Sequence, residues 1–522
     1  MNDTTTKPTA RRIGRFKRSA FVAAFLELLS LGLTAQGVKA GSATWNFHPT
    51  NSDWNTAANW TPATVPNDPA DVATFESSDT TNVSISGITT VDGIVFNPDA
   101  SAFTIATAPS GNLTLSGAGI ANNSGIAQNF VVGVGDGLIE FLNRATAGSG
   151  TTFSNSGFID FFDSSNADEG SFSNNGATST STAHGVTFFF DSSTAGDGTF
   201  INNSATGSGI IGGSTAFAGR SSAANGTFIN YGGGHTDFND GSLADNSTLI
   251  THGGSIQFSS KSSGGSAQVE LFGFGQLDIT DHLSPGLTIG SLEGDSFVFL
   301  GSNNLTIGSN SLNTEFSGLI QDGTISGGSG AALIKIGTGR FTLSSANTYT
   351  EGTTISDGAL VVSNTTGSAT GSGAVRVNAG TLGGRGIVAG AVTIGSGSGT
   401  GAFLAPRIGA STLTGLTIQS TLTFEADGTY TYRLNTRKAR AYYVIANGVT
   451  IDSGAQFNFT AVANKKLTAG KVFTVISNTS ATPISGTFAN LADDSTFAAG
   501  RNKFQVNYEG GDGNDLTLTV LQ

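Results

Sequence analysis

Residues 157–176 read GFIDFFDSSNADEGSFSNNG, and stretches of the same pattern recur along the first half of the chain. The opening motif, Gly-x-Ile/Val/Thr-x-Phe, begins 20 to 28 residues apart in successive copies. The copies are GLIEF from Gly137, GFIDF from Gly157, GVTFF from Gly185, GSTAF from Gly213, GHTDF from Gly234, GSIQF from Gly254 and GQLDI from Gly275. In several copies a second motif, such as GSFSNNG from Gly170, follows a polar corner. Each repeat thus contains two or three short alternating strands separated by Gly, Asn, Ser and Asp turns.

A period of this length, built from short strands, is typical of a stacked solenoid. We predict an all-β fold, a parallel β-helix with one repeat per coil and an atypical N-terminal cap. Corresponding strands of neighbouring coils then pair about 4.8 Å apart. The Phe residues of the motif are expected to stack as ladders in the core, and the Asn residues of the NSG, NNG and NNS turns are expected to stack likewise.

The composition excludes several classes of protein. The 522 residues include 74 Gly and no Cys, and the net charge is −13. Each interior Gly costs a helix about 1 kcal/mol relative to Ala, so a helix-rich fold is disfavoured. The lack of Cys excludes a disulfide framework, a thiolate metal site and a Cys nucleophile. The acidic balance argues against a nucleic-acid partner, which requires a basic surface.

Residues 1–40 have the features of a signal peptide. Basic residues between Arg11 and Arg18 precede an apolar segment at residues 20–33, and Val38-Lys39-Ala40 provides a small-residue cleavage site. The apolar segment is shorter than the ~20 residues that span a bilayer. We therefore expect cleavage after Ala40, export, and no transmembrane segment in the mature chain.

Residues 41–110 differ from the repeats because they contain all three Trp residues, Trp45, Trp54 and Trp60. A solenoid needs an atypical terminal coil to close its core, so we interpret this segment as an N-terminal cap. The alternative is a platform on which Trp rings stack against a carbohydrate. The β-helix repeat array is expected over residues 111–290.

Two later stretches follow a longer pattern. SGLIQDG begins at Ser317, and LIKIGTGRFTLSSANTYTEGTTISDGALVV extends from Leu333 to Val362. They resemble the autotransporter-associated β-strand repeat family, or passenger-associated transport repeats, of exported bacterial β-helix proteins. We place such repeats at residues 291–405, followed by C-terminal β-rich coils and a cap at residues 406–522.

The resemblance implies a right-handed parallel β-helix of pectin-lyase-like type. It also implies a link to transport of a passenger across the outer membrane rather than to catalysis. Members of this kind end in a translocator barrel of alternating strands. Because the chain stops at Gln522, soon after the last repeat-like stretch, we expect no such barrel here.

Enzymes that cleave polysaccharides by hydrolysis use paired carboxylates about 5–10 Å apart. Acidic residues recur at similar repeat positions, but their places at strand ends favour corner or solvent-facing roles. They are Asp160, Asp163, Asp191, Asp237 and Asp240. The segment Gly510–Asp515 resembles half of a calcium-binding turn, in a single copy. We assign no catalytic, cofactor-binding or metal-binding residue.

The sequence therefore predicts a non-catalytic, exported bacterial β-helical protein with a structural or adhesin-like role at the surface or outside the cell. A polysaccharide lyase or glycoside hydrolase of the same fold, and a Trp-mediated carbohydrate-binding module, are the alternatives. The expected partner is a cell-surface or extracellular polysaccharide. An outer-membrane-associated or periplasmic location and the oligomeric state stay open.

Charge is distributed unevenly along the mature chain. Residues 41–320 contain three basic and 24 acidic residues, whereas residues 321–522 contain 14 basic and 11 acidic residues. A local basic cluster is formed by Arg433, Arg437, Lys438 and Arg440. The C-terminal part is therefore the better candidate for docking to an anionic surface.

Overall fold

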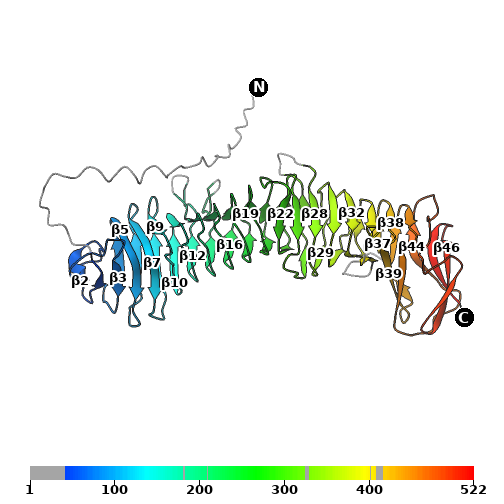
Figure 1. The fold of residues 1–522 in the computed structure, drawn as a ribbon, viewed down its shortest axis with the longest axis horizontal. Coiled ribbons are helices and arrows are strands. Elements are labelled where there is room, and N and C mark those ends of the chain that lie inside the picture. The colour runs from blue at the N-terminus through cyan, green and yellow to red at the C-terminus, as the bar shows by residue number, and fades with distance from the viewer. Residues whose placement is uncertain are drawn as a thin grey trace, which may run out of the picture. The chain divides into compact units, whose positions relative to one another are not determined.

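Strands alternate with tight turns along the described part of the chain, and the strands of successive coils pair in parallel (Figure 1). The computed structural model describes residues 41–179, 183–207, 210–323, 329–399, 401–406 and 415–521. The predicted signal peptide lies outside these residues. Among them, no helix has the length and apolar character needed to cross a membrane. The parallel β-helix predicted from the repeat is confirmed, with about 16 turns.

The first sheet contains the Gly-x-x-x-Phe motifs. Its strands all pair in parallel except β2, which pairs antiparallel with β1 at the N-terminal end. In spatial order they are β2 (Trp60–Thr61), β1 (Ala43–Trp45), β3 (Val72–Phe75), β5 (Ile88–Phe96), β7 (Asn112–Asn122), β9 (Leu138–Phe141), β11 (Phe158–Phe161), β13 (Val186–Phe189), β15 (Ser214–Phe217), β17 (His235–Phe238), β19 (Ser255–Phe258), β21 (Gln276–Asp278), β24 (Phe297–Phe299) and β27 (Leu319–Gln321). A 3₁₀ turn, η1 (Ala57–Asn59), precedes β2.

The second sheet continues from the N-terminal coils into the C-terminal third. Its successive strands are β4 (Asn82–Ile85), β6 (Thr104–Thr107), β8 (Gln128–Val132), β10 (Thr151–Asn155), β12 (Ser171–Asn174), β14 (Thr199–Asn202), β16 (Thr227–Tyr231), β18 (Thr248–His252), β20 (Gln268–Phe272), β23 (Ser291–Gly294), β26 (Thr314–Phe316), β29 (Arg340–Leu343), β31 (Ala359–Val362), β33 (Gly380–Gly384), β36 (Ala402–Ala405), β39 (Gly428–Asn435) and β43 (Gln456–Val462). A short strand, β40 (Arg440–Ala441), pairs antiparallel with the end of β39.

Two further sheets belong to the second half of the chain. The third is parallel and consists of β22 (Gly286–Ile289), β25 (Asn304–Ile307), β28 (Ala332–Lys335), β30 (Gly352–Ile355), β32 (Ala374–Val377), β35 (Val392–Ile394), β38 (Leu422–Phe424) and β42 (Val449–Ile451). The fourth consists of β34 (Ile387–Val388), β37 (Gly415–Ile418), β41 (Tyr443–Ala446), β44 (Val472–Asn478), β47 (Asp515–Val520), β46 (Asn502–Gly510) and β45 (Thr496–Ala499). Its last strands pair antiparallel, so the parallel stack ends there.

The core is built from aromatic ladders, as the repeat predicts. Side chains alternate between buried and partly exposed along each strand, which places the Phe of every motif inside. In the first sheet, neighbouring rings stack with centroids 4.5–4.9 Å apart; the ladder consists of Phe141, Phe161, Phe189, Phe217, Phe238 and Phe258. A second ladder in the second sheet runs through Phe130, Phe153, Phe172, Phe200 and Phe228.

A buried column of asparagines accompanies the second ladder. The side-chain amides of Asn155, Asn174 and Asn202 each donate to the Oδ1 of the next Asn, at 2.8, 2.9 and 2.7 Å, and the column ends at Asn230. Buried amides are costly unless they are hydrogen-bonded, and this stacking satisfies them from coil to coil. The stacked Asn turns predicted from the sequence are therefore present, inside the core.

Candidate functional site

The three Trp residues of residues 41–110 close the N-terminal end of the core. Trp45, Trp54 and Trp60 are at most 1% exposed, and their rings contact one another and Phe75. Each indole N–H donates to a backbone carbonyl. Because stacking on a sugar needs an open ring face, the carbohydrate platform suggested as an alternative is wrong for these three residues. Their role is that of the predicted cap.

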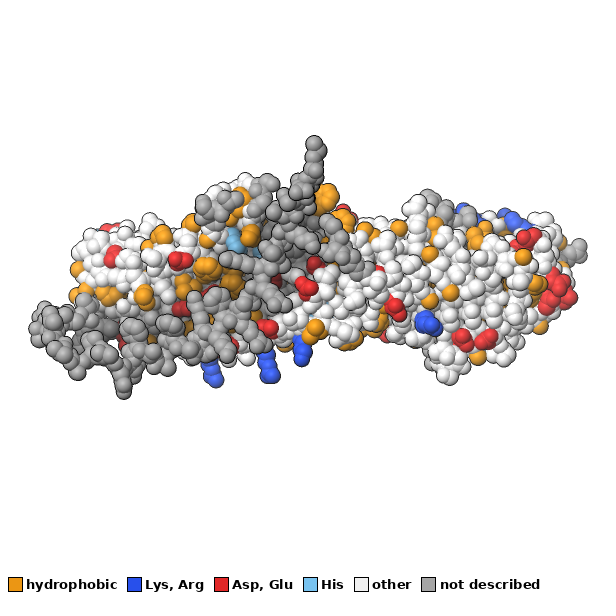
Figure 2. Space-filling model, turned by 90° about the horizontal axis from the view of Figure 1, so that it is seen from above, with side chains coloured by type: hydrophobic (Ala, Val, Ile, Leu, Met, Phe, Trp, Pro, Cys, Tyr) orange, Lys and Arg blue, Asp and Glu red, His pale blue; other side chains and the backbone are white. Residues whose placement is uncertain are grey.

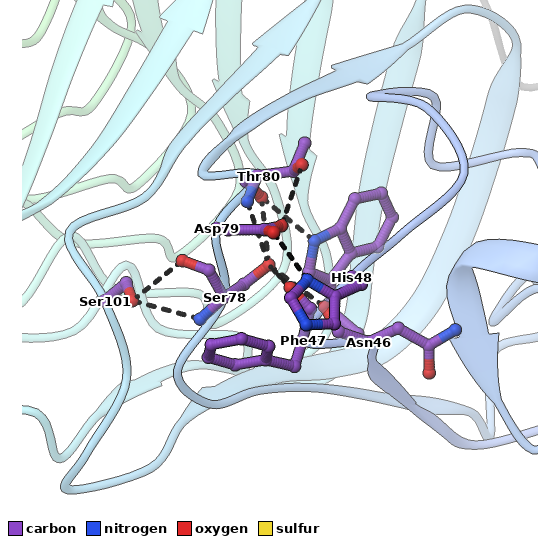
Figure 3. A network of polar contacts seen from close by, with 8 residues as sticks. Asn46, Phe47, His48, Ser78, Asp79, Thr80 and Ser101 are labelled. Carbon is purple, nitrogen blue, oxygen red and sulfur yellow. Dashed lines mark hydrogen bonds and ion pairs between the residues drawn. The ribbon is translucent and has the colours of Figure 1, made fainter.

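A polar network lies beside this cap (Figure 3). The Nδ1 atom of His48 lies 2.5 Å from Oδ2 of Asp79, and both side chains are more than half exposed. The hydroxyl of Ser78 lies near the carbonyl oxygens of Asn46 and Phe47, at 3.0 and 3.2 Å. A nucleophilic Ser would need its hydroxyl bonded to the His. Ser78 instead ties two loops of the cap together.

Three of the repeated acids occupy corners of the coils. Asp163, Asp191 and Asp240 have φ values of 56°, 53° and 56°, a left-handed conformation that Asp adopts more readily than most residues. The carboxylate of Asp163 accepts the backbone N–H of Asn143, and that of Asp191 accepts the N–H of Asp163. These contacts link adjacent corners, so the structure places the three acids in the corner role expected from the sequence.

The other two repeated acids point outward from the first sheet and lie far apart. At the register position of Asp160 in β11, the next three strands carry Phe188, Ala216 and Asp237 in turn. Three strand intervals correspond to roughly 14 Å, beyond the spacing of paired catalytic carboxylates. Asp160 and Asp237 therefore do not form such a pair.

Asp237 belongs to a small His/Asp cluster. Its Oδ2 lies 3.6 Å from Nε2 of His235, and the ring of His184 lies 6.4 Å from that of His235. Burial raises the pKa of Asp237, against the opposing effect of His235. Burial, and then the neighbouring His235, lower the pKa of His184. Within the described ranges, no group of three or more His, Asp or Glu residues has a geometry that could hold a metal ion.

A carboxylate pair that sequence reasoning missed lies on the outer face of the second sheet. Glu270 in β20 is the direct neighbour of Glu293 in β23. Burial and the charge of Glu293 raise the pKa of Glu270, while His252 opposes the shift. Aligning Gln268-Val-Glu-Leu with Ser291-Leu-Glu-Gly would have revealed the pair, because both Glu residues hold the same strand position.

The segment Gly510–Asp515 forms the turn of the β46–β47 hairpin. Gly510 pairs with Asp515 across antiparallel strands, and Oδ1 of Asp515 accepts the backbone N–H of Asn478 at 2.8 Å. Calcium-binding turns of the nonapeptide type instead stack between parallel coils. The arrangement serves to attach the terminal hairpin to β44.

A buried lysine lies in the middle of the stack. Lys335, at the end of β28, is 1% exposed and occupies a position that alternation assigns to the core. Its Nζ donates to the carbonyl oxygens of Ile336, Gly337 and Asp357, at 2.6, 2.7 and 3.4 Å. Burial lowers the pKa of Lys335 to about 8, against the opposing charge of Asp357. The ammonium group thus ties one turn to the next coil.

Residues 333–362, which begin two residues before this lysine, match the family model described as the passenger-associated-transport-repeat. The chain carries a passenger-associated transport repeat. It covers most of β28, together with β29, β30 and β31, and these strands pair with the coils before and after them. No curated protein matches the chain. Repeat and fold together fit an autotransporter passenger-like β-helical protein.

Proposed function

We propose that the chain is an exported, non-catalytic β-helical protein that acts as a structural or adhesin-like element at the cell surface or outside the cell. The single observation that carries this proposal is the passenger-associated transport repeat, which forms a regular part of the stack. Within this repeat, Lys335 is buried inside the coil, and its ammonium group donates hydrogen bonds to three backbone carbonyl oxygens. The repeat therefore supports a role in building the passenger rather than in chemistry.

The outer surface supports the same role. Figure 2 shows, on one face, acidic side chains distributed along the coils among hydrophobic and other side chains. The repeated acids are either tied into corners or separated along the first sheet. A long surface of this kind suits a spacer or adhesive element that presents the same face coil after coil.

Cell fractionation tests the proposal. A C-terminally tagged full-length chain should leave the cytoplasm, and its mature N-terminus should be Gly41. The control is the same chain without residues 2–40, which should stay inside. A full-length chain that remains cytoplasmic with an intact N-terminus would overturn the proposal.

A second candidate function rests on Glu270 and Glu293. Neighbouring carboxylates, one with a raised pKa, are the elements from which glycoside hydrolases make an acid and a nucleophile. The test is release of reducing ends from a panel of plant and algal polysaccharides. Hydrolysis by the native chain that is lost in the Glu270→Gln/Glu293→Gln variant would establish this function, whereas no release from any polymer would remove it.

A further inference from the structure

A basic pocket lies on the outer face of the stack in its C-terminal third. It is formed where β39 extends beyond its pairing with β36, which ends at Tyr430, and turns back through β40. β43 pairs with β39 along its other edge, from Thr429 to Asn435. The β39–β40 hairpin therefore extends beyond the preceding coil and contributes to a concave surface.

Cationic side chains line this pocket. It has a volume of about 120 Å³ and is lined by Arg433, Asn435, Lys438, Arg440, Tyr442 and Val462. Alternation along β39 buries Tyr432 and Leu434 and directs Arg433 and Asn435 outward. The amide oxygen of Asn435 accepts the backbone N–H of Lys438 at 3.0 Å, which fixes the turn that carries the lysine.

The positive charge of the pocket is not neutralised by acidic side chains. In the part of the chain that the structure describes, no ion pair within 4.0 Å joins Arg433, Lys438 or Arg440 to an Asp or Glu. Three cations held in one concavity create a local positive potential, which attracts a counter-charge from solution. The contrast with residues 41–320, which hold 24 acidic residues, makes this potential a local feature.

The ring of Tyr442 helps to hold Arg440 in place. The guanidinium carbon of Arg440 lies 5.6 Å from the ring centroid of Tyr442, and that of Arg385 lies 4.9 Å from the same centroid. These distances fall in the range of cation–π attraction. An arginine held in this way loses less conformational entropy on binding, so the site is organised before a ligand arrives.

We propose that this pocket binds the carboxylate or phosphate groups of an anionic polysaccharide and so docks the C-terminal third of the stack. Planar guanidinium groups recognise both kinds of anion through paired hydrogen bonds. The volume is smaller than that of pockets for whole small molecules, so it suits one charged group of a longer polymer. This ligand rests on the proposed function, because it assumes that the protein acts at the cell surface or outside the cell.

The charge distribution favours a polymer over a membrane. An anionic lipid surface would repel the acidic coils of residues 41–320 as it approached the pocket. A polysaccharide strand can reach the pocket without bringing a second charged surface against those coils. Val462 is the one aliphatic side chain lining the pocket, which gives a lipid tail little to bind.

Calorimetry on the purified full chain tests the inference, with polygalacturonate as the carboxylate probe, phosphorylated mannan as the phosphate probe and uncharged dextran as the blank. We expect one charged polymer or both to bind, with an affinity that falls as salt is added. The Arg433→Gln/Arg440→Gln variant should bind roughly a hundredfold more weakly, because each charged hydrogen bond is worth about tenfold. The Arg340→Gln/Arg376→Gln variant makes the same charge change at exposed positions in β29 and β32 and should bind like the native chain.

Three results would overturn the inference. These are equal weakening by both double variants, no binding of either charged polymer, and preferential binding to phosphatidylglycerol vesicles. Circular dichroism shows whether each variant is folded, and Arg433→Lys/Arg440→Lys gives a second comparison in which charge is kept and the planar groups are lost. Affinity for this variant should lie between those of the native chain and the Gln variant. Binding by the purified protein does not depend on export. A failure to bind the polymers is therefore distinguishable from a failure of export.

Discussion

The side-chain amide of Asn174 donates to Oδ1 of Asn202, one coil further on, at 2.9 Å and out of contact with solvent. The same Oδ1 of Asn202 also accepts the hydroxyl of Thr215 at 3.0 Å. Two sheets are thereby joined to the same buried amide. The polar column thus fixes the register of the coils, since a shift by one residue would expose every Asn and bury its neighbour.

Removing one amide from this column should therefore be costly. We expect Asn202→Ala to lower the free energy of unfolding by about 2–4 kcal/mol, because it removes one hydrogen bond from each of the buried amides of Asn174 and Asn230 and takes away the acceptor of the buried Thr215 hydroxyl. The control is Asn225→Ala at an exposed corner position, which should cost less than about 1 kcal/mol. Urea unfolding followed by circular dichroism measures the free energy of unfolding of both variants. Equal losses in the two variants would contradict the stabilising role of the column.

The Phe ladder gives a second comparison between adjacent residues. Phe189 is buried between Phe161 and Phe217, whereas Phe188 points to the outer face. Phe189→Ala should destabilise the protein by about 3–5 kcal/mol through the cavity it leaves. Phe188→Ala should cost clearly less in the same urea measurement. A reversed order would mean that the strand faces the other way.

Lys335 should make stability depend on pH in the alkaline range. Its pKa of about 8 in the folded chain lies below that of an exposed lysine, so between these values the unfolded chain binds more protons at this position. The free energy of unfolding should therefore rise from pH 7.5 to pH 9.5. In Lys335→Met, which lacks the charge, this rise should be absent. Parallel pH profiles of urea midpoints for the two proteins would contradict the assignment.

The raised pKa of Glu270 predicts a pH dependence of the opposite sign from that of a stabilising carboxylate. Above its ordinary pKa, the unfolded chain releases this proton more readily than the folded chain, so ionisation of Glu270 weakens the stack as the pH rises. Glu270→Gln should remove that loss and raise the urea midpoint at pH 7. Glu315→Gln, at an exposed strand position, is the matched control and should leave the midpoint unchanged. A lower midpoint in Glu270→Gln than in the control would refute the repulsion from Glu293.

The fold could be predicted from the sequence because every repeat has the same alternation of buried and outward-facing side chains. Every Gly-x-x-x-Phe motif places one Phe on the same face of the same sheet, so a single alternation pattern predicts the whole ladder from Phe141 to Phe258. The cap was predictable for a similar reason, since Trp45, Trp54 and Trp60 break the repeat at its end. The domain boundaries expected from the sequence stay predictions.

The remaining features depend on contacts that the repeat does not encode. Lys335 stands at a position that alternation reserves for apolar side chains, and only the surrounding carbonyl oxygens explain it. Arg385 reaches Tyr442 because the coils between them stack, although the two residues lie far apart in sequence. The basic cluster was visible in the sequence, but its concave shape comes from the β39–β40 hairpin.

The stacking of one repeat per coil is the claim on which the rest depends, and cysteine cross-linking tests it most directly in a chain that has no Cys. Ile201 is the direct neighbour of Ile229, and Ile229 of Ile250, on the outer face of the second sheet. Neighbouring strands lie within the reach of a disulfide, whereas two intervals exceed it. Oxidation should therefore cross-link Ile201→Cys/Ile229→Cys and leave Ile201→Cys/Ile250→Cys reduced. Cross-linking of the second pair in preference to the first would contradict the parallel stack.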